Sequence, residues 1–507
     1  MLSDFLQNIV LGFSAVSSWD NLAFCFIGVL IGTLIGVLPG IGPIAAISLL
    51  LPTTYHTTAL QAIIMLSGIY YGAQYGGSIT SILINIPGEA ASVITCIDGY
   101  QMALKGRAGS ALGISAFGSF IGGTLSIIWL MLIAAPLAQV ALAFGPPEYF
   151  ALLLVGVLLL TYLGGGSRVK SLMMAVFGLF LGVIGTDVLT GEDRFVYGSA
   201  TLIDGLGLAP VAMGLFGISE VLMNLTGIRE KREMVKTSLK HLLPNAREWR
   251  RSLMPIVRGS ILGFLLGVLP GGGAIISSFA SYAIEKKTSR HPEEFGKGAI
   301  EGVAGPETAN NAASGGAFVP LLILGVPANS VMAILMGAFL IHGLQPGPLL
   351  LTNNPQIFWG IIVSMYMGNV MLLILNLPLI GIWVQILRIP YVVLFPLIIM
   401  FAVLGCYSVN YNIHEVVIMG IFGMIGYFLR KLDFNCGPII FGLIMSPMLE
   451  NAFRQSLLMS QGSFAIFVTR PISLTFSIVF LLLVFMPMLK LPKWLSWLGG
   501  AKDLDAS

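Results

Sequence analysis

Two eight-residue stretches, one in each half of the chain, share a helix-breaking pattern. Gly36-Val-Leu-Pro-Gly-Ile-Gly-Pro43 returns as Gly267-Val-Leu-Pro-Gly-Gly-Gly-Ala274. Proline lacks a backbone N–H and glycine frees the backbone, so each Pro-Gly pair is expected to end one half-helix and start another. The new helix N-terminus presents unpaired N–H groups and partial positive charge, which suit a carboxylate. The alternative is a kink that serves packing alone.

The pattern belongs to a longer internal repeat. Tyr75–Ser92 is matched by Ser314–Ser330, and Gly99–Gly109 is matched by Gly337–Gly347. Three blocks that recur in the same order at a nearly constant offset indicate a repeated unit. Interrupted apolar segments at corresponding places in two halves are typical of the central site of a secondary transporter.

The composition places this repeat in a membrane. Hydrophobic residues make up 56% of the 507 residues and charged residues 10%, whereas soluble domains carry about 25% charged residues. This excludes an ordinary cytosolic enzyme, a disordered chain and a disulfide scaffold. Long apolar runs predict an all-α polytopic membrane protein with about 10–12 transmembrane helices, broken helices and re-entrant hairpins. Four short runs are expected not to cross the bilayer: Ile44–Leu51, Ile79–Ile86, Phe318–Leu324 and Pro438–Met445.

Basic residues indicate the orientation of the chain. No Lys or Arg precedes Lys105, whereas Arg229–Arg258 holds nine. The positive-inside rule places this segment in the cytoplasm, so the halves would form two inverted-topology repeats. The expected organisation is an N-terminal amphipathic segment (1–20), a first repeat (21–228), a basic cytoplasmic connector (229–258), a second repeat (259–489) and a polar C-terminal tail (490–507). The net charge of +3 is too small to indicate nucleic-acid binding.

Polar side chains at the repeated breaks are the candidate ligands. Each of two stretches, Gly76–Gly88 and Glu307–Ser330, is interpreted as a re-entrant hairpin with a polar tip, because hydroxyls and amides at membrane depth need partners. They could bind a carboxylate or Na⁺, although each residue alone is more often a packing contact. The candidate substrate-binding residues are Gly40, Gly42, Ser78, Thr80, Asn85, Pro87, Gly88, Gly271, Gly272, Asn310, Asn311, Ser314, Pro327 and Asn329.

Charged residues beside these breaks have two interpretations. Glu89 and Glu307 are the candidates for ion coupling, by binding a cation or carrying a proton, and the alternative is a helix cap. Lys105 and Lys297 could pair with substrate carboxylates or only mark loops. The sequence holds no P-loop, no G-x-S-x-G and no HExxH. These absences predict no catalytic residue, no cofactor and no metal, hence no enzyme.

The repeated blocks resemble a known family. Together with Asp98–Gly109 and Phe295–Gly316, they are similar to the large membrane subunit of tripartite tricarboxylate transporters, the TctA type. The resemblance runs from about Asn21 to past Met445. The family's hairpin tips correspond to Asn85–Ser92 and Gly325–Ser330. These tips depart from the usual family patterns, and tips are where substrate selectivity would lie.

The resemblance implies a multi-pass permease of the bacterial inner membrane. It would be driven by a Na⁺ or H⁺ gradient and import organic di- or tricarboxylates such as citrate. Its expected partners are a small four-span membrane subunit and a periplasmic solute-binding protein, besides membrane lipid and, as an open question, further copies of the chain. Alternating access of the elevator type is an analogy with other hairpin-bearing transporters. The alternatives are a stand-alone permease or channel for another small solute and, less favoured, an intramembrane enzyme.

Overall fold

The computed structural model describes residues 2–38, 42–163, 167–187, 190–226, 242–271, 273–387 and 391–485. Within these ranges the chain is almost entirely helical, apart from one antiparallel pair, β1 (Gly185–Thr186) and β2 (Asp193–Arg194). The predicted tail at 490–507, and residues 229–241 of the predicted connector, lie outside the described residues.

The fold is that of an all-α polytopic membrane protein, as the composition predicts. Six helical stretches of the described chain are long and apolar enough to cross a bilayer, and further apolar helices are shorter. The long stretches are Trp19–Val37 (α2), Ala108–Ala141 (α6), Leu208–Leu225, Ala246–Val268 (α12), Pro355–Asn376 (α17) and Ile413–Lys431 (α20).

The first Pro-Gly break separates α2 from a short helix, α3 (Gly42–Leu50), which leads through the 3₁₀ turn η1 (Leu51–His56) into α4 (Ala59–Ile84). Helices α2 and α4 run side by side in the same direction. A Cβ added at Gly28 would lie 2.3 Å from the Met65 carbonyl oxygen, and one at Gly36 2.3 Å from that of Ala73. For α2 and α4 to be parallel, α3 and η1 must bring the chain back. The chain therefore forms a re-entrant hairpin at the Pro-Gly break.

The second Pro-Gly break repeats this arrangement. Helix α12 is followed by α13 (Gly273–Thr288), the turn η4 (Pro292–Glu294) and α14 (Glu301–Gly316). A Cβ at Gly263 would lie 2.2 Å from the Ala309 carbonyl oxygen, and one at Gly267 2.3 Å from that of Ala313, so α12 and α14 are parallel. Arg258 of α12 pairs with Glu285 of α13 at the far end of the hairpin from its tip. In each half, glycines therefore allow one hairpin to pack closely against a buried helix.

The second set of breaks follows α4 and α14. Helix α4 ends at Asn85 in the left-handed conformation (φ 56°), and η2 (Ala90–Ser92) and α5 (Val93–Leu104) follow. The π-helical turn η5 (Pro320–Leu324) ends at Gly325, also left-handed (φ 68°), before α15 (Ser330–Ile341). Two of the four short runs are parts of longer helices: most of Ile79–Ile86 belongs to the 26-residue helix α4, and Pro438–Met445 opens the 23-residue helix α21. The hairpins are formed instead by α2 with α3 and by α12 with α13, and the tip of the first falls at 39–41, outside the described residues.

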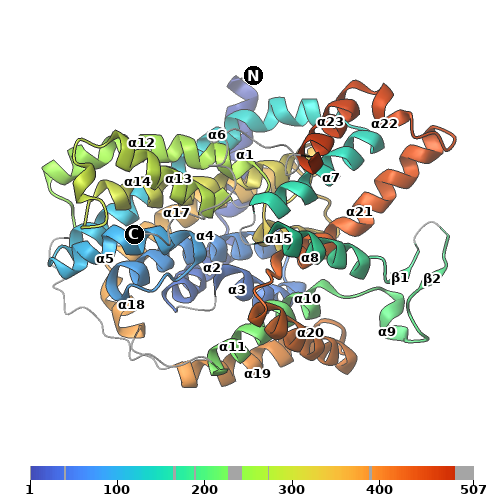
Figure 1. Cartoon of the computed structure of the whole chain (residues 1–507), viewed down its shortest axis with the longest axis horizontal. Helices are drawn as coiled ribbons and strands as arrows, with labels where there is room; N and C mark the ends of the chain where they lie inside the picture. The colour runs from blue at the N-terminus through green and yellow to red at the C-terminus, as the bar shows by residue number, and fades with distance from the viewer. Residues whose placement is uncertain are drawn as a thin grey trace.

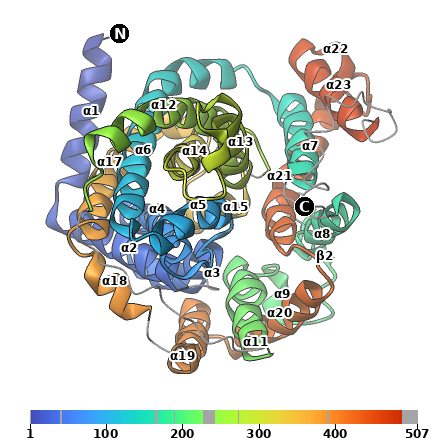
Figure 2. The same cartoon turned by 60° about the vertical axis from the view of Figure 1, so that its left-hand side comes forward.

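Helices α4 and α14 cross the centre of the molecule in opposite directions. The Ser78 hydroxyl of α4 lies 2.5 Å from the Glu307 carboxylate of α14. Earlier on α4, the Tyr71 ring stacks at 5.8 Å on Phe318, which follows α14. Residue numbers therefore rise along one helix as they fall along the other. Figure 2 shows α4, α5 and α14 surrounded by α6, α12, α13 and α17. We call helices α2–α6, α12–α15 and α17 the central block.

Two groups of helices flank the central block, and Figure 2 shows one to its right and the other below it. Figure 1 gives the labels of all these helices. The first peripheral group packs through Gly178 of α8, where a Cβ would lie 2.1 Å from the Ile439 carbonyl oxygen of α21. It comprises α7 (Pro146–Leu163), α8 (Arg168–Leu181), α21 (Gly437–Met459), α22 (Ile466–Thr469) and α23 (Pro471–Phe485). The second comprises α10 (Leu208–Ala212), η3 (Met213–Ile218), α11 (Ser219–Thr226), α19 (Tyr391–Asn410) and α20.

The remaining helices lie outside these three assemblies. Helix α1 (Leu2–Val16) packs along α17, where a Cβ at Gly12 would lie 2.6 Å from the Trp359 carbonyl oxygen. The short helices are α9 (Ala200–Ile203), α16 (Pro348–Asn353) and α18 (Ile380–Ile386).

Glycine contacts between hairpin and buried helix yield a stability prediction. In Gly263→Ala the new methyl group meets a backbone oxygen of α14, which cannot move without disturbing that helix. We expect a loss of about 1–3 kcal/mol, typical of overpacking, measured as a lower thermal unfolding midpoint in detergent. Gly420→Ala on α20 is the matched control, because a Cβ there meets nothing within 4 Å. Equal midpoints for the two variants would contradict the packing of α12 on α14.

Candidate functional site

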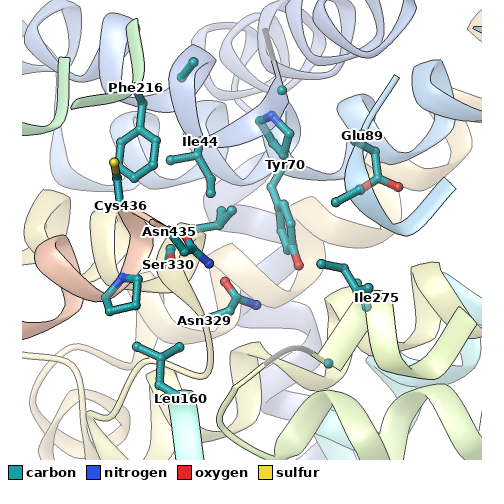
Figure 3. A pocket seen from close by; sticks show the side chains of 18 of the residues that line it. Ile44, Tyr70, Glu89, Leu160, Phe216, Ile275, Asn329, Ser330, Asn435 and Cys436 are labelled. Atoms are coloured by element: carbon teal, nitrogen blue, oxygen red, sulfur yellow. The ribbon is translucent and has the colours of Figure 1, made fainter. Parts of the chain in front are cut away.

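A cavity of about 380 Å³ lies where the central block meets both peripheral groups. The central block contributes the start of α3, part of α4, the second hairpin tip and the start of α15. The peripheral groups contribute Leu160 of α7, Phe216 of η3, Arg430 of α20 and the segment Phe434–Pro438 before and in α21. Figure 3 shows Phe216, Asn435 and Cys436 on one side and Tyr70 and Glu89 on the other. We call this the central cavity; its volume lies within the range of about 300–1,000 Å³ usual for small-molecule sites.

Four of the described helices begin at the wall of the central cavity: α3, α13, α15 and α21. The Pro-Gly breaks provide the first two of these N-termini and the second set of breaks the third. Each N-terminus carries unpaired backbone N–H groups and roughly half a positive charge. Gly271, at φ 135°, donates its N–H to the Ala328 carbonyl oxygen at 2.7 Å, which joins the second hairpin tip to the break before α15. The arrangement concentrates positive potential where a small anion would fit.

The polar side chains of the cavity come from both repeats. Tyr70 and Gln74 lie one turn apart on α4, and the Tyr70 hydroxyl points toward Asn329 (Figure 3). Asn329 caps α15 by accepting the Met332 N–H at 3.0 Å. Glu89 occupies the equivalent place in the first repeat, where it accepts the Ala91 N–H at 2.9 Å. Asn310 of α14 donates to the Glu89 carboxylate at 3.2 Å, so a residue of each repeat meets the other.

Behind this wall, Glu307 is the centre of a buried hydroxyl network. Its carboxylate accepts hydrogen bonds from Ser78 of α4 at 2.5 Å and from Thr95 of α5. A third hydroxyl, from Ser115 of α6, faces the same group. Glu307 is 1% exposed. A carboxylate this deeply buried is stabilised by hydrogen bonds, a bound cation or a proton.

The structure separates the predicted site residues into three sets. Gly42, Glu89, Gly271 and Asn329 line the central cavity. Ser78, Thr80, Asn310, Asn311 and Ser314 are buried behind it, bonded to Glu307, Glu89, Ser119 or nearby backbone oxygens. Asn85, Pro87, Gly88 and Pro327 do not line the cavity, and Gly40 and Gly272 lie outside the described residues. Asn85 is exposed, and its left-handed backbone matches that of Gly325, so it ends a helix.

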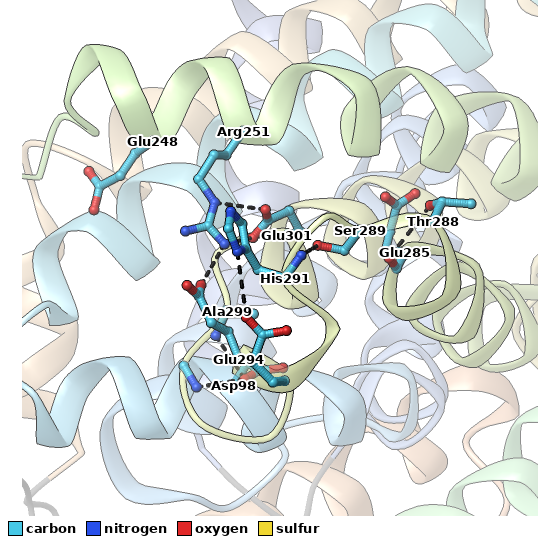
Figure 4. A network of polar contacts seen from close by, with 12 residues as sticks. Asp98, Glu248, Arg251, Glu285, Thr288, Ser289, His291, Glu294, Ala299 and Glu301 are labelled. Atoms are coloured by element: carbon cyan, nitrogen blue, oxygen red, sulfur yellow. Dashed lines mark hydrogen bonds and ion pairs between the residues drawn. The ribbon is translucent and has the colours of Figure 1, made fainter.

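The lysines considered as carboxylate ligands lie elsewhere. Lys105 donates to the Lys297 carbonyl oxygen, and neither residue lines the central cavity. Lys297 donates its backbone N–H to the Glu294 carbonyl oxygen at 2.9 Å, which places both lysines beside a polar network. Figure 4 shows this network, which ties α5 and α12 to the loop before α14. There Arg251 pairs with Glu294 at 2.6 Å and with Glu301 at 2.7 Å. The hydrogen bond from Arg251 holds the pKa of the Glu294 carboxyl below its ordinary value, so this pair stays charged at neutral pH.

Asp98 is the second element of that network. It accepts the backbone N–H groups of Gly296, Gly298 and Ala299 at 2.9, 2.7 and 2.9 Å, and the Tyr282 hydroxyl at 2.9 Å. A carboxylate of the first repeat thereby holds a loop of the second. Asp98 and Glu301, which lie beside the repeated blocks in sequence, therefore hold neighbouring segments together in this arrangement: Asp98 binds the loop before α14, and Glu301 binds Arg251 of α12.

Arg430 is a cavity residue that the sequence interpretation missed. Glu89 and Arg430 are the two charged residues among the described cavity-lining residues. Arg430 is in the last turn of α20, a place that in sequence marks only the end of an apolar span. Tyr70 and Gln74 could have been found, because they lie four residues apart in register with Ser78 on a helix that is otherwise apolar or glycine-rich.

A second cavity, of about 800 Å³, lies beyond the break before α15. Leu324 and Gly325 border the second cavity, whereas Asn329 and Ser330 border the central one. The buried segment Val326–Ala328 separates them. Helices α7 and α21 pass along both: Leu153 and Met448 face the second cavity, and Leu160 and Pro438 the central one.

Paired helix breaks around a cavity that holds polar side chains from both halves, inside a polytopic α-helical protein, are typical of a membrane transport protein. The family can be stated more closely. Residues 22–441 match the model of the tripartite tricarboxylate transporter TctA family, and the chain belongs to that family. The predicted resemblance is thereby confirmed, and membership in a transporter family fits a chain that is not an enzyme.

Two relatives come from Agrobacterium vitis. One, described as an uncharacterized 52.8 kDa protein in the TAR-I ttuC′ 3′ region, is 49% identical over 472 residues, 93% of this chain and 94% of that relative. The other, described as an uncharacterized protein in the TAR-II ttuC′ 3′ region, is 53% identical over 211 residues, 42% of this chain and 87% of that relative. No solved structure matches the chain.

The hydroxyl network yields a prediction for Glu307. Glu307→Ala would leave the Ser78 and Thr95 hydroxyls without their shared acceptor, whereas Glu307→Gln keeps an oxygen that accepts and adds an amide that donates. We expect the alanine variant to be less stable than the glutamine variant by about 1–3 kcal/mol, the cost of an unsatisfied buried polar group. Thermal unfolding in detergent measures the difference. Glu192→Ala, at an exposed position, is the control, and equal stability of both Glu307 variants would refute the network.

Proposed function

We propose that this chain is the carrier subunit that moves organic di- or tricarboxylates such as citrate across the bacterial inner membrane. The observation that carries the proposal is the convergence of four helix N-termini on one cavity that also holds Arg430. Backbone N–H groups and a guanidinium are the donors that carboxylates favour. Tyr70 and Gln74, four residues apart on α4, add a hydroxyl and an amide that orient the substrate.

We further propose that the two repeats are inverted in the membrane. Three features support this: the matching hairpins, the opposite directions of α4 and α14, and the matching left-handed ends at Asn85 and Gly325. With Arg229–Arg258 in the cytoplasm, the first hairpin enters from the periplasm and the second from the cytoplasm. The tips then meet near the middle of the membrane, where secondary transporters hold their substrates.

Alternating access is the mechanism that the two cavities support best. They lie on opposite sides of the buried segment Val326–Ala328, and α7 and α21 run along both. About seven residues of helix, or 10 Å, separate Leu153 from Leu160. If the central block moved by about this distance along α7 and α21, the site would close to one face of the membrane and open to the other. In this elevator-type motion the central block slides along α7 and α21, the two helices that both cavities touch.

Glu89 provides a physical reason for ion coupling. Its carboxylate shares the central cavity with the proposed anionic substrate. Two unit charges about 4 Å apart repel by about 4 kcal/mol at an effective dielectric constant of about 20. A proton or Na⁺ on Glu89 removes this repulsion, so substrate and ion bind better together, and each raises the affinity of the other equally. Glu307, one layer deeper, is the second candidate for the same ion.

The family name implies partner subunits, and we propose a small four-span membrane protein and a periplasmic solute-binding protein. The longest polar segment of this chain lies within residues 229–258, the last part of which already belongs to α12, so it is too short to form a capture domain for dilute substrate. Membrane lipid and further copies of the chain complete the proposed set of partners.

Uptake by membrane vesicles tests the function. Vesicles that hold the chain and its small subunit should take up radiolabelled citrate or succinate with high affinity only when periplasmic extract is added. Asn329→Asp retains the acceptor that caps α15 and puts a negative charge on the cavity wall. Repulsion of about 4 kcal/mol predicts an affinity loss on the order of a hundredfold or more.

Asn85→Gly is the matched control for Asn329→Asp. Its backbone is left-handed, so glycine fits without strain, and the position lies off the cavity. Normal affinity in Asn329→Asp, with both variants equally expressed, would contradict the site. High-affinity uptake without extract would favour the stand-alone permease instead.

Glu89→Gln tests the coupling. The amide oxygen still accepts the Ala91 N–H, so η2 keeps its cap, but the charge that the ion neutralises is gone. We expect substrate exchange across the vesicle membrane to persist while accumulation driven by a Na⁺ or pH gradient is lost. Gradient-driven accumulation at the wild-type level would exclude Glu89 as the coupling residue. Glu192→Gln, exposed and distant in sequence from the breaks, serves as the control.

A further inference from the structure

Arg430 of α20 belongs to the peripheral wall of the central cavity, whereas the second hairpin tip and the start of α15 belong to its central-block wall. Its guanidinium pairs with Glu220 of α11, and its Cζ lies 5.9 Å from the centre of the Phe216 ring. Both Phe216 and Arg430 line the cavity. The side chain is 24% exposed and that of Glu220 17%, so this ion pair is partly buried at the edge of the cavity.

The pairing with Glu220 orients the guanidinium and leaves other N–H donors of Arg430 available. Glu220 contacts the Nη1 group of Arg430 and also accepts from the Asn224 amide at 2.9 Å, which fixes it on α11. A guanidinium carries five N–H donors in a planar fork, so a second carboxylate can bind at another edge. A single partly buried arginine is costly without a counter-charge. Glu220 therefore keeps the cation in place when the cavity holds no substrate.

Groups that can bind a carboxylate come from both sides of the cavity wall, which we call its two ends. The N-termini of α13 and α15, with Asn329, belong to the central-block end, and Arg430 belongs to the peripheral end on α20. A molecule with one carboxylate satisfies one end. A molecule with two or three carboxylates satisfies both at once, and the second contact forms without a further loss of translational freedom.

We propose that Arg430 binds a second carboxylate of the substrate and so selects di- and tricarboxylates over monocarboxylates. This inference rests on the proposed function, since it assigns the specificity of the same site. The remaining charged residue on the wall, Glu89, lies on the central block with the N-termini of α3, α13 and α15, so Arg430 is the charged side chain of the peripheral end.

Transport of two acids that differ in carboxylate number tests the assignment. In vesicles that hold the full chain and its small subunit, with periplasmic extract or free substrate at high concentration, uptake of succinate and propionate is compared. Arg430→Gln should raise the KM for succinate on the order of ten- to a hundredfold, the value of a lost hydrogen bond between charged groups. Uptake of propionate should stay at its wild-type level. Arg430→Lys, which keeps the charge but not the fork, should lie between.

The control is Arg454→Gln. Arg454 of α21 also makes partly buried ion pairs, with Asp187 at 2.8 Å and Glu450 at 2.9 Å, and it does not line the central cavity. Its loss should leave the succinate-to-propionate ratio unchanged. Glu220→Gln removes the counter-charge but keeps an amide oxygen that can accept from the same Nη1 group, so the guanidinium stays oriented and succinate affinity should rise.

The outcomes distinguish a failure of the Arg430 assignment from a failure of the proposed function. Equal effects of Arg430→Gln on both acids, or on neither, would overturn the assignment. If Arg430→Gln does not reach the membrane, Arg430→Lys decides by the same ratio, and an unchanged ratio overturns the proposal. A wild-type protein that transports neither acid nor citrate would contradict the proposed function itself.

Discussion

Inside a bilayer, every backbone group released by a broken helix needs a partner within the protein. This requirement shapes the centre of the molecule. Each hairpin is held by glycines that let its backbone approach the buried helix beside it, as at Gly36 against Ala73 and Gly267 against Ala313. The second tip is fixed further by the hydrogen bond from Gly271 to Ala328. The helices α13 and α15 that follow these breaks begin at the wall of the central cavity, so the constraint that holds the fold also places their N-termini where we propose that the substrate binds.

The two halves share a plan and differ where function requires it. Asn85 and Gly325 end their helices in the same left-handed conformation, and Glu89 and Asn329 cap the next segments in the same way. One cap is a charged acid and the other a neutral amide. We propose that the acid binds the coupling ion and that the amide faces the substrate. Arg430, outside the repeated blocks, supplies the cation that neither cap offers.

The sequence predicts much of this and fails at definable points. The Pro-Gly breaks, the repeat and the family follow from local pattern, because proline and glycine act on their own backbone. Helix length at Ile79–Ile86 was underestimated because Gly76, Gly77 and the hydroxyls before it look like a loop. In the structure those glycines let α4 touch α2 and the Glu89 segment, and the hydroxyls bond to α4 or to Glu307. Arg430 could not be predicted, since only tertiary packing brings α20 to the cavity.

A structure of the complex with a bound dicarboxylate tests the central claim most directly. The account predicts anion density in the central cavity, with one carboxylate at the N-termini of α13 and α15 near Asn329 and the other at Arg430. Density confined to the second cavity, or beside Lys105 and Lys297, would contradict it.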